Sequence, residues 1–133
     1  GDPEAYYFNH KGTDIRLNGD MQVVLNALGE PKKYTEETSC AFEGLDKSYY
    51  YGSFYLETYP QGDKDFVSGW WFADDSVTTP EGIYIGSSKA EVEKAYGTDG
   101  YNGSNAYTVN KDAGMLTIIL ENDVVSSIQY SIK

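Results

Sequence analysis

The sequence predicts an α+β protein built from two tandem repeats, each a short helix packed on an antiparallel β-meander, with one curved sheet that carries both helices on one face. Three observations lead to this prediction: two short amphipathic helix patterns, aromatic-rich strand patterns after each of them, and the same order of elements in both halves. A chain of 133 residues suffices for one compact body. We therefore expect residues 1–75, which include an N-terminal hairpin, and residues 76–133 to share a core.

The first predicted helix lies between Asn18 and Gly29. Its apolar residues recur at helical spacing and are Met21, Val24, Leu25 and Leu28. The pattern ends at Gly29 and Pro31, because glycine is favoured just after a helix and proline cannot continue one.

The second predicted helix has a stronger start signal. Ser88 and Glu91 form a Ser-x-x-Glu capping box, in which the two residues bond each other's backbone N–H groups. The apolar face that follows consists of Val92, Ala95 and Tyr96. Gly97 then ends the helix.

A repeat is visible in the order of elements. The segment Ile15–Gly29 aligns with Ile83–Gly97 and is identical to it at four positions. Each helix pattern is followed by a short strand and two long strands, separated by turn residues. The predicted strands are Cys40–Phe42, Tyr49–Tyr59 and Phe66–Phe72 in the first half, and Ala106–Val109, Met115–Glu121 and Val124–Ile132 in the second. A hairpin of Tyr6–Phe8 and Ile15–Leu17 is expected before the first helix.

Alternation along the strands divides their side chains between two faces. The face expected under the helices carries Phe54, Leu56, Trp70, Phe72, Leu116, Ile118, Ile128 and Tyr130. The opposite face of the first half is expected to be aromatic and to bind a partner through Tyr49, Tyr51, Tyr55, Tyr59 and Trp71. Two interpretations of these rings stay open: cross-strand pairing that only stabilises the sheet, and an anchor surface, since Tyr and Trp dominate binding hot spots.

Charge and composition limit the partners. The chain has 10 Lys and Arg against 21 Asp and Glu, and its net charge of −11 repels nucleic acid and bare anionic membranes. The 13 tyrosines suit an exposed binding face, because each has an apolar ring with a polar tip. No stretch reaches the roughly 20 apolar residues that cross a bilayer. Membrane contact is expected only through a lipid anchor upstream of Gly1, on a targeting segment removed from the chain.

The residues that could carry catalysis or bind a metal form no recognisable site, so we expect no enzyme, no cofactor and no metal. His10 is the only histidine and precedes a turn, and Cys40 is expected to pack in the core. The carboxylate pairs Glu36-Glu37 and Asp74-Asp75 are expected in turns or solvent. The loop Asp99–Asn105 lacks the spaced acids of an EF-hand.

The segment Ile83–Gly97 has the pattern apolar-x-Ile-Gly-x-Ser-x-x-x-Val before its closing glycine, with Ile15–Gly29 as its counterpart. This pattern, followed by an antiparallel meander, resembles the repeat of the β-lactamase-inhibitor-protein and BamE (SmpA/OmlA) lipoprotein superfamily. The segments Ser39–Lys47 and Thr79–Ile83, together with Tyr59-Pro60, resemble uncharacterised lipoproteins of Gram-positive gut bacteria. The resemblance implies a secreted or lipid-anchored bacterial surface protein that binds protein over a concave aromatic sheet face.

Four functions are weighed, and the last is an enzyme whose only support would be carboxylates such as Asp65, Asp74 and Asp75 converging in a cleft. The leading one is a non-catalytic cell-envelope or secreted binding module that engages an unidentified protein through the aromatic face. The second is recognition of glycan or cell-wall fragments, with the same rings stacked on sugars. The third is β-lactamase inhibition, which follows from fold resemblance alone, while the single cysteine rules out the disulfides that brace those inhibitors.

Overall fold

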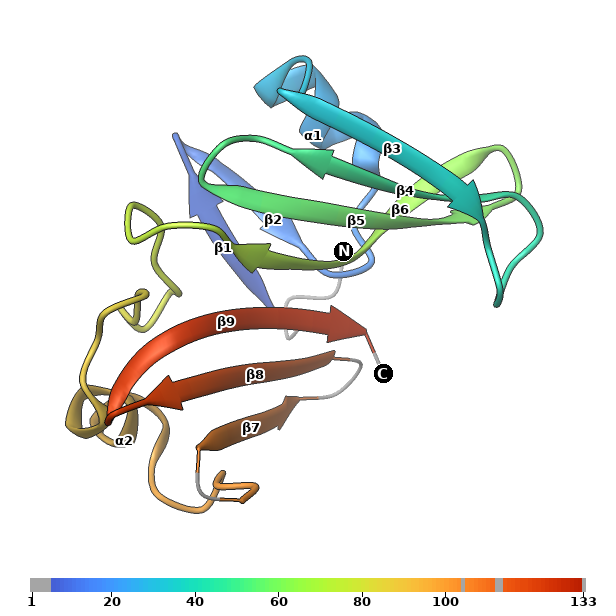
Figure 1. Cartoon of the computed structure of the whole chain (residues 1–133). Coiled ribbons are helices and arrows are strands. Elements are labelled where there is room, and N and C mark those ends of the chain that lie inside the picture. Colours follow the sequence, from blue (N-terminus) through green and yellow to red (C-terminus); the bar gives the residue numbers. More distant parts are fainter. Residues whose placement is uncertain (1–5, 104, 112–113, 133) are drawn as a thin grey trace.

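The computed structural model describes residues 6–103, 105–111 and 114–132. In this part of the chain, two helices accompany a seven-stranded antiparallel sheet and a separate two-stranded hairpin (Figure 1). The elements are β1 (Tyr7–His10), β2 (Thr13–Arg16), α1 (Met21–Leu28), β3 (Lys33–Thr38), β4 (Leu45–Tyr50), β5 (Phe54–Gln61), β6 (Lys64–Phe72), α2 (Lys89–Tyr96), β7 (Ala106–Lys111), β8 (Gly114–Glu121) and β9 (Val124–Ile132). The predicted α+β class is confirmed.

The capping residues of both helices lie within the segments that the sequence predicts. At α1, the Asp20 carboxylate accepts a hydrogen bond from the backbone N–H of Gln22, and Gly29 ends the helix with a φ of 76°. At α2, the capping box of Ser88 and Glu91 is present in both directions. The caps fix both helices at their predicted sites.

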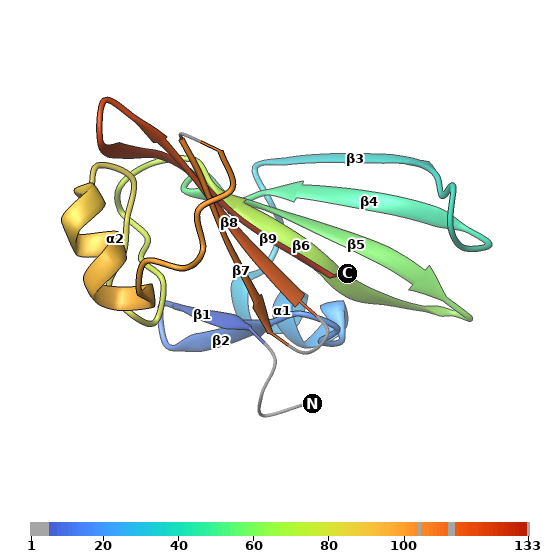
Figure 2. The same cartoon turned by 90° about the horizontal axis from the view of Figure 1, so that it is seen from below.

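Each helix is tied to the strands. Helix α1 packs against β2 and β6, and the N–H of Asn18 just before it donates to the Val67 carbonyl at 2.8 Å. Helix α2 is joined to the turn between β8 and β9, where the N–H of Lys89 donates to the Asp123 carbonyl at 2.9 Å. Seen from below, α1 and the β1–β2 hairpin lie together beside the sheet (Figure 2).

The sheet is continuous because the last strands of the two meanders pair with each other. Its order is β3–β4–β5–β6–β9–β8–β7, so the first meander ends at β6 and the second at β9. The joint consists of the pairs Gly69↔Ser131, Trp70↔Tyr130 and Trp71↔Gln129. The two halves thus form one sheet rather than two.

Aromatic side chains fill the core at this joint. The Trp70 and Tyr130 rings lie 5.0 Å apart, and Phe8 of the hairpin packs 5.1 Å from Trp70 and 5.0 Å from Phe54. The predicted core face is confirmed, because all its members are at most 4% exposed: Phe54, Leu56, Trp70, Phe72, Leu116, Ile118, Ile128 and Tyr130. The hairpin therefore closes the core over the junction of the two meanders.

Two strand predictions in the first half are wrong. The predicted strand Cys40–Phe42 is a loop, in which the Ser39 hydroxyl accepts hydrogen bonds from the backbone N–H groups of Ala41 and Phe42. Cys40 is exposed there instead of packing in the core. The strand at this edge is β3, whose six residues are all exposed and therefore show no apolar alternation.

The predicted strand Tyr49–Tyr59 is two strands joined by a turn. Gly52 adopts a φ of 98°, a conformation that glycine reaches without a Cβ clash, and the chain reverses between β4 and β5. The N–H of Tyr51 closes this turn on the Phe54 carbonyl at 3.0 Å. The reversal changes which side chains share a face.

Gly69→Ala tests the joint between β6 and β9. A Cβ at this position would lie 2.5 Å from the Tyr130 carbonyl oxygen, which belongs to the paired strand and cannot move aside alone. We expect a loss of about 1–3 kcal/mol in the free energy of unfolding, measured by urea titration. Ser68→Ala, which adds no atom one residue earlier, is the control. Equal stability of Gly69→Ala and the native protein would contradict the close approach.

Candidate functional site

The face of the sheet opposite the core, here called the open face, carries a row of three aromatic rings. Tyr50, Tyr55 and Trp71 stand opposite one another on β4, β5 and β6. The Tyr50 and Tyr55 rings lie 4.5 Å apart, and Tyr55 and Trp71 lie 4.6 Å apart with only 15° between their planes. We call these three residues the aromatic row; each is partly exposed.

The aromatic row belongs to a line of paired residues that crosses the entire sheet. On one side Lys33 of β3 pairs with Tyr50, and its ammonium nitrogen lies 5.9 Å from the centroid of that ring. On the other side the register continues through polar residues of the second meander, namely Gln129, Thr117 and Thr108. The open face is therefore aromatic over the first meander, while over the second it carries polar side chains together with Met115 and Ile119.

A second aromatic group lies farther along β5. Tyr59 packs 5.8 Å from Phe66 of β6 and stacks at 4.9 Å on Phe42 of the β3–β4 loop. Its hydroxyl donates to Asn18 Oδ1 at 2.7 Å. These contacts hold the loop against the sheet, and we call Phe42, Tyr59 and Phe66 the aromatic corner.

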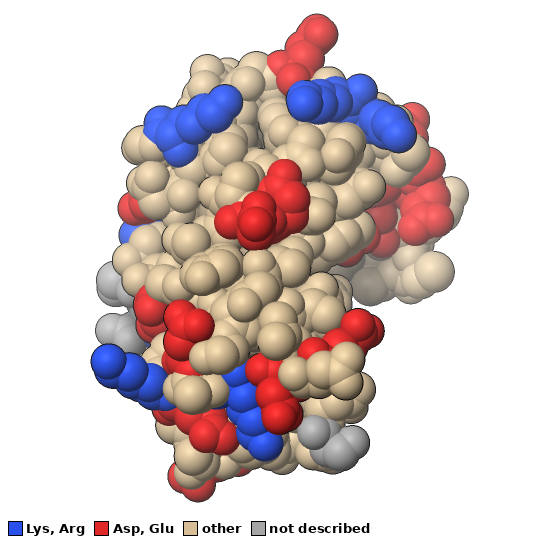
Figure 3. Space-filling model, turned by 60° about the vertical axis from the view of Figure 1, so that its left-hand side comes forward, with Lys and Arg blue, Asp and Glu red and all other residues tan. Residues whose placement is uncertain are grey.

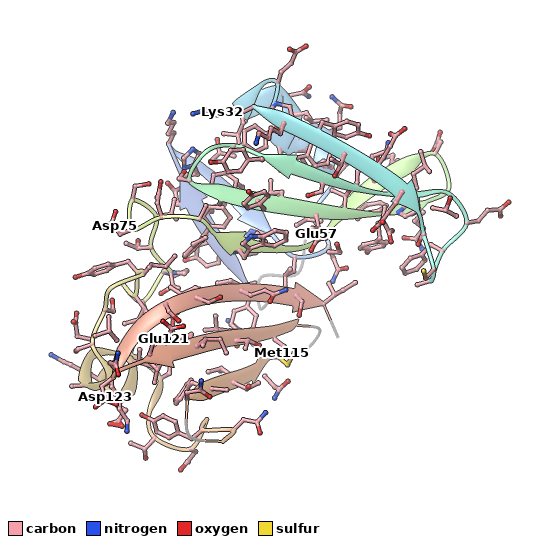
Figure 4. The ribbon with its side chains drawn as sticks, viewed as in Figure 1. Lys32, Glu57, Asp75, Met115, Glu121 and Asp123 are labelled. Atoms are coloured by element: carbon pink, nitrogen blue, oxygen red, sulfur yellow. The ribbon has the colours of Figure 1, made fainter. Side chains whose placement is uncertain are left out.

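Glu57 stands between the two aromatic groups. It shares the open face of β5 with Tyr55 and Tyr59, each about 6.7 Å along the strand. Its partner in register on β6 is Gly69, which has no side chain to cover the carboxylate. Glu57 lies beside the central strands, far from Glu121 and Asp123 at the other end of the molecule (Figure 4).

A shallow hollow surrounds the Glu57 carboxylate. It measures about 280 Å³, and its lining includes three further acids, Glu36 and Glu37 of β3 and Asp46 of β4, together with Lys47 of β4. We call Glu37, Asp46 and Glu57 the acidic hollow. Partial removal of water, followed by repulsion from Asp46 and Glu37, raises the pKa of Glu57 above its ordinary value. The residue as a whole is exposed.

The nearby cations do not neutralise the acidic hollow. Lys47 also lines the hollow, but its ammonium group donates to Asp65 at 2.7 Å. The other ion pairs between described residues join Arg16 to Asp14 and Lys64 to Asp20. Among the described residues, then, none of the ion pairs includes a member of the acidic hollow.

Three of the five predicted site residues lie on the open face, namely Tyr55, Tyr59 and Trp71. The placement of Tyr49 there is wrong: it pairs with Leu56 on the core face and is only 4% exposed. Tyr51 also lies elsewhere, because its ring stacks on Phe54 at 5.5 Å and its hydroxyl donates to the Gly29 carbonyl at 3.0 Å.

Tyr50 belongs to the site and was not predicted from the sequence. The turn at Gly52 reverses the chain, so the residue opposite Tyr55 is Tyr50 and not Tyr49 or Tyr51. The dipeptide Gly52-Ser53 is a turn signal inside the predicted strand and could have located this reversal. The three acids gave no local signal, because each lies on a different strand.

The residues that could have carried catalysis stay apart. His10 packs 4.8 Å from Phe54, and burial, followed by the charge of Lys11, lowers its pKa. Asp74 accepts hydrogen bonds from the Ser76 side chain and backbone, which lower its pKa. The predicted loop Asp99–Asn105 lies partly outside the described residues.

The described residues contain neither a metal-binding cluster nor a membrane-spanning helix. No group of His, Cys, Asp and Glu within residues 6–103, 105–111 and 114–132 is placed to hold a metal ion. No helix in that part of the chain is long and apolar enough to cross a membrane. The open face offers apolar rings and carboxylates for non-covalent binding.

Glu57→Gln tests the repulsion in the hollow. A carboxyl whose pKa is raised by folding favours the folded state at low pH, and this contribution is lost as the pH rises through the raised pKa. At pH 7 the ionised group opposes folding, so Glu57→Gln should raise the melting temperature there. The gain should vanish at pH values below the ordinary glutamate pKa. Thermal melts by circular dichroism across this range measure it, with Glu121→Gln as the matched control; equal gains in both variants would assign the effect to net charge.

Comparison with protein-family models, curated proteins and solved structures finds no match for this chain. Its function is therefore inferred from the geometry of the open face and from the residues of the sequence.

Proposed function

We propose that this chain is a non-catalytic binding module that engages a protein partner through the open face of its sheet. The observation that carries this proposal is the aromatic row, three partly exposed rings packed side by side on a sheet face opposite the core. Tyr and Trp are enriched at binding hot spots because they offer large apolar area with a polar group. The aromatic corner extends this surface along β5.

The open face suits protein binding because it is preorganised. The rings already stack on one another, and the aromatic corner is held by the Tyr59 hydroxyl bond to Asn18. Side chains that are ordered before binding lose less conformational entropy on association. A strand-borne surface of this kind also changes little in shape when a partner docks.

Glycan binding is the weaker alternative. Sugars stack on the flat face of an aromatic ring, whereas Tyr55 lies between Tyr50 and Trp71 and has both faces covered. Stacked neighbours on adjacent strands turn their edges, not their faces, away from the sheet. Soluble glycans should therefore leave the tryptophan fluorescence of this protein unchanged; quenching that is lost in Trp71→Ala would favour the glycan function instead.

An interpretation of the fold as two tandem repeats supports the same proposal. We infer that the two meanders, which meet at their last strands, are diverged tandem repeats with their helices on one side of the sheet. Such a repeat resembles the β-lactamase-inhibitor-protein and BamE superfamily. By that resemblance we propose a secreted or lipid-anchored location at a bacterial surface, with β-lactamase inhibition as a subordinate proposal.

The double variant Tyr55→Ala, Trp71→Ala tests the proposed function. We expect it to abolish capture of a specific protein from cell-envelope extract, and to weaken the purified complex by at least tenfold, because truncating a hot-spot side chain costs about 2 kcal/mol or more. Tyr34→Ala is the control, since Tyr34 is an exposed tyrosine of β3 that packs on the core-face residue Tyr49. Tyr34→Ala should retain capture of the protein. Capture that survives in the double variant would contradict the proposal.

A further inference from the structure

The open face combines two chemistries in one place. The aromatic row and the aromatic corner stand on either side of Glu57 along β5, and Asp46 and Glu37 approach the same carboxylate from β4 and β3. The three acids are unpaired with any cation among the described ion pairs. A negative centre thus lies between two aromatic groups along β5.

The rest of the molecule contributes to the same field. The net charge is −11. Figure 3 shows one side of the molecule, where acidic side chains lie among broad uncharged areas and basic side chains gather mainly toward the two ends. A field of this sign attracts basic partners over distances of about one Debye length, which is about 8 Å at physiological ionic strength.

Resting on the proposed function, we propose that the partner presents a basic segment, and that a Lys or Arg side chain of this segment enters the acidic hollow while its neighbours cover the aromatic row and corner. Lys and Arg have apolar stems that pack on aromatic rings and charged heads that bind carboxylates. Tyr55 and Tyr59 flank Glu57 along β5, so rings for the stem and a carboxylate for the head lie next to each other.

The size of the hollow favours a protein side chain over a free small molecule. Pockets for small molecules measure about 300–1,000 Å³ and enclose most of their ligand. The hollow is about 280 Å³ and lies open on the face of the sheet. It offers room for one side chain that is held in place by a larger partner.

A second copy of this chain does not fit the open face. Two copies docked face to face would bring their acidic hollows together, and juxtaposed like charges oppose association. Nucleic acid is excluded by the same charge. Electrostatic complementarity therefore singles out a basic protein segment.

The test uses a blocked peptide, Gly-Arg-Leu-Lys-Gly-Arg, and its acidic counterpart Gly-Glu-Leu-Glu-Gly-Glu as probes. Binding is followed by NMR titration of the full chain, which detects weak complexes and shows which backbone amides respond. We expect the basic peptide to shift amides of β4, β5 and β6, and its Kd to rise about tenfold in Glu57→Gln. Glu121→Gln, the matched control on β8, should change the Kd by less than twofold.

The outcomes separate local recognition from general attraction. Binding should weaken when the ionic strength rises from about 0.01 M to about 1 M, because the Debye length falls from about 30 Å to about 3 Å. Equal loss in Glu57→Gln and Glu121→Gln, absence of binding, or equal binding of the acidic peptide would each overturn the proposal. Thermal melts of Glu57→Gln check that the variant is folded under the titration conditions, which separates loss of binding from unfolding.

The same variant distinguishes the failure of this inference from the failure of the proposed function. One outcome is that the double variant Tyr55→Ala, Trp71→Ala loses a captured partner that Glu57→Gln retains. That result would support the binding module and overturn the proposal that its partner is basic. A partner that is lost with both variants supports both proposals.

Discussion

The pairing of β6 with β9 is the constraint on which the structure depends. Only three residue pairs join the two meanders, and Trp70 and Tyr130 lie in the middle of them with their rings 5.0 Å apart in the core. The neighbouring position must be Gly69, because a Cβ there would collide with the Tyr130 carbonyl oxygen. This close approach turns two small units, each too small to enclose a core of its own, into one sheet with one core.

The same joint creates the open face. Since the register runs through β6 into β9, the side chains opposite the core form one surface from Lys33 to Thr108. Its aromatic half stabilises the sheet through cross-strand stacking and also offers an anchor surface, so the two interpretations of the tyrosines are compatible. The stacking that stabilises the sheet is also the preorganisation that a binding surface needs.

We propose that the acidic hollow makes this surface selective for basic partners. Burial, followed by repulsion from Asp46 and Glu37, disfavours the ionised form of Glu57 in the folded state, and a basic partner would offset the repulsion. Sites that bind charged partners commonly carry such unfavourable local charge, because the partner supplies the compensating group. In the proposed complex the aromatic rings beside the carboxylates would add apolar contact, so affinity and choice of partner would arise from adjacent but different groups.

Sequence alone determined the elements whose signals are local: the capping box of α2, the apolar face of α1, the N-terminal hairpin and the alternation that places Phe54 and Trp70 in the core. The site was predicted only in part, with Tyr55, Tyr59 and Trp71 on the open face. The glycine turn reversed the chain at Gly52, replaced Tyr49 and Tyr51 by Tyr50, and showed that strand alternation holds only between turns. Tertiary structure alone brought Glu37, Asp46 and Glu57 together, because sheet register joins residues that no sequence spacing relates.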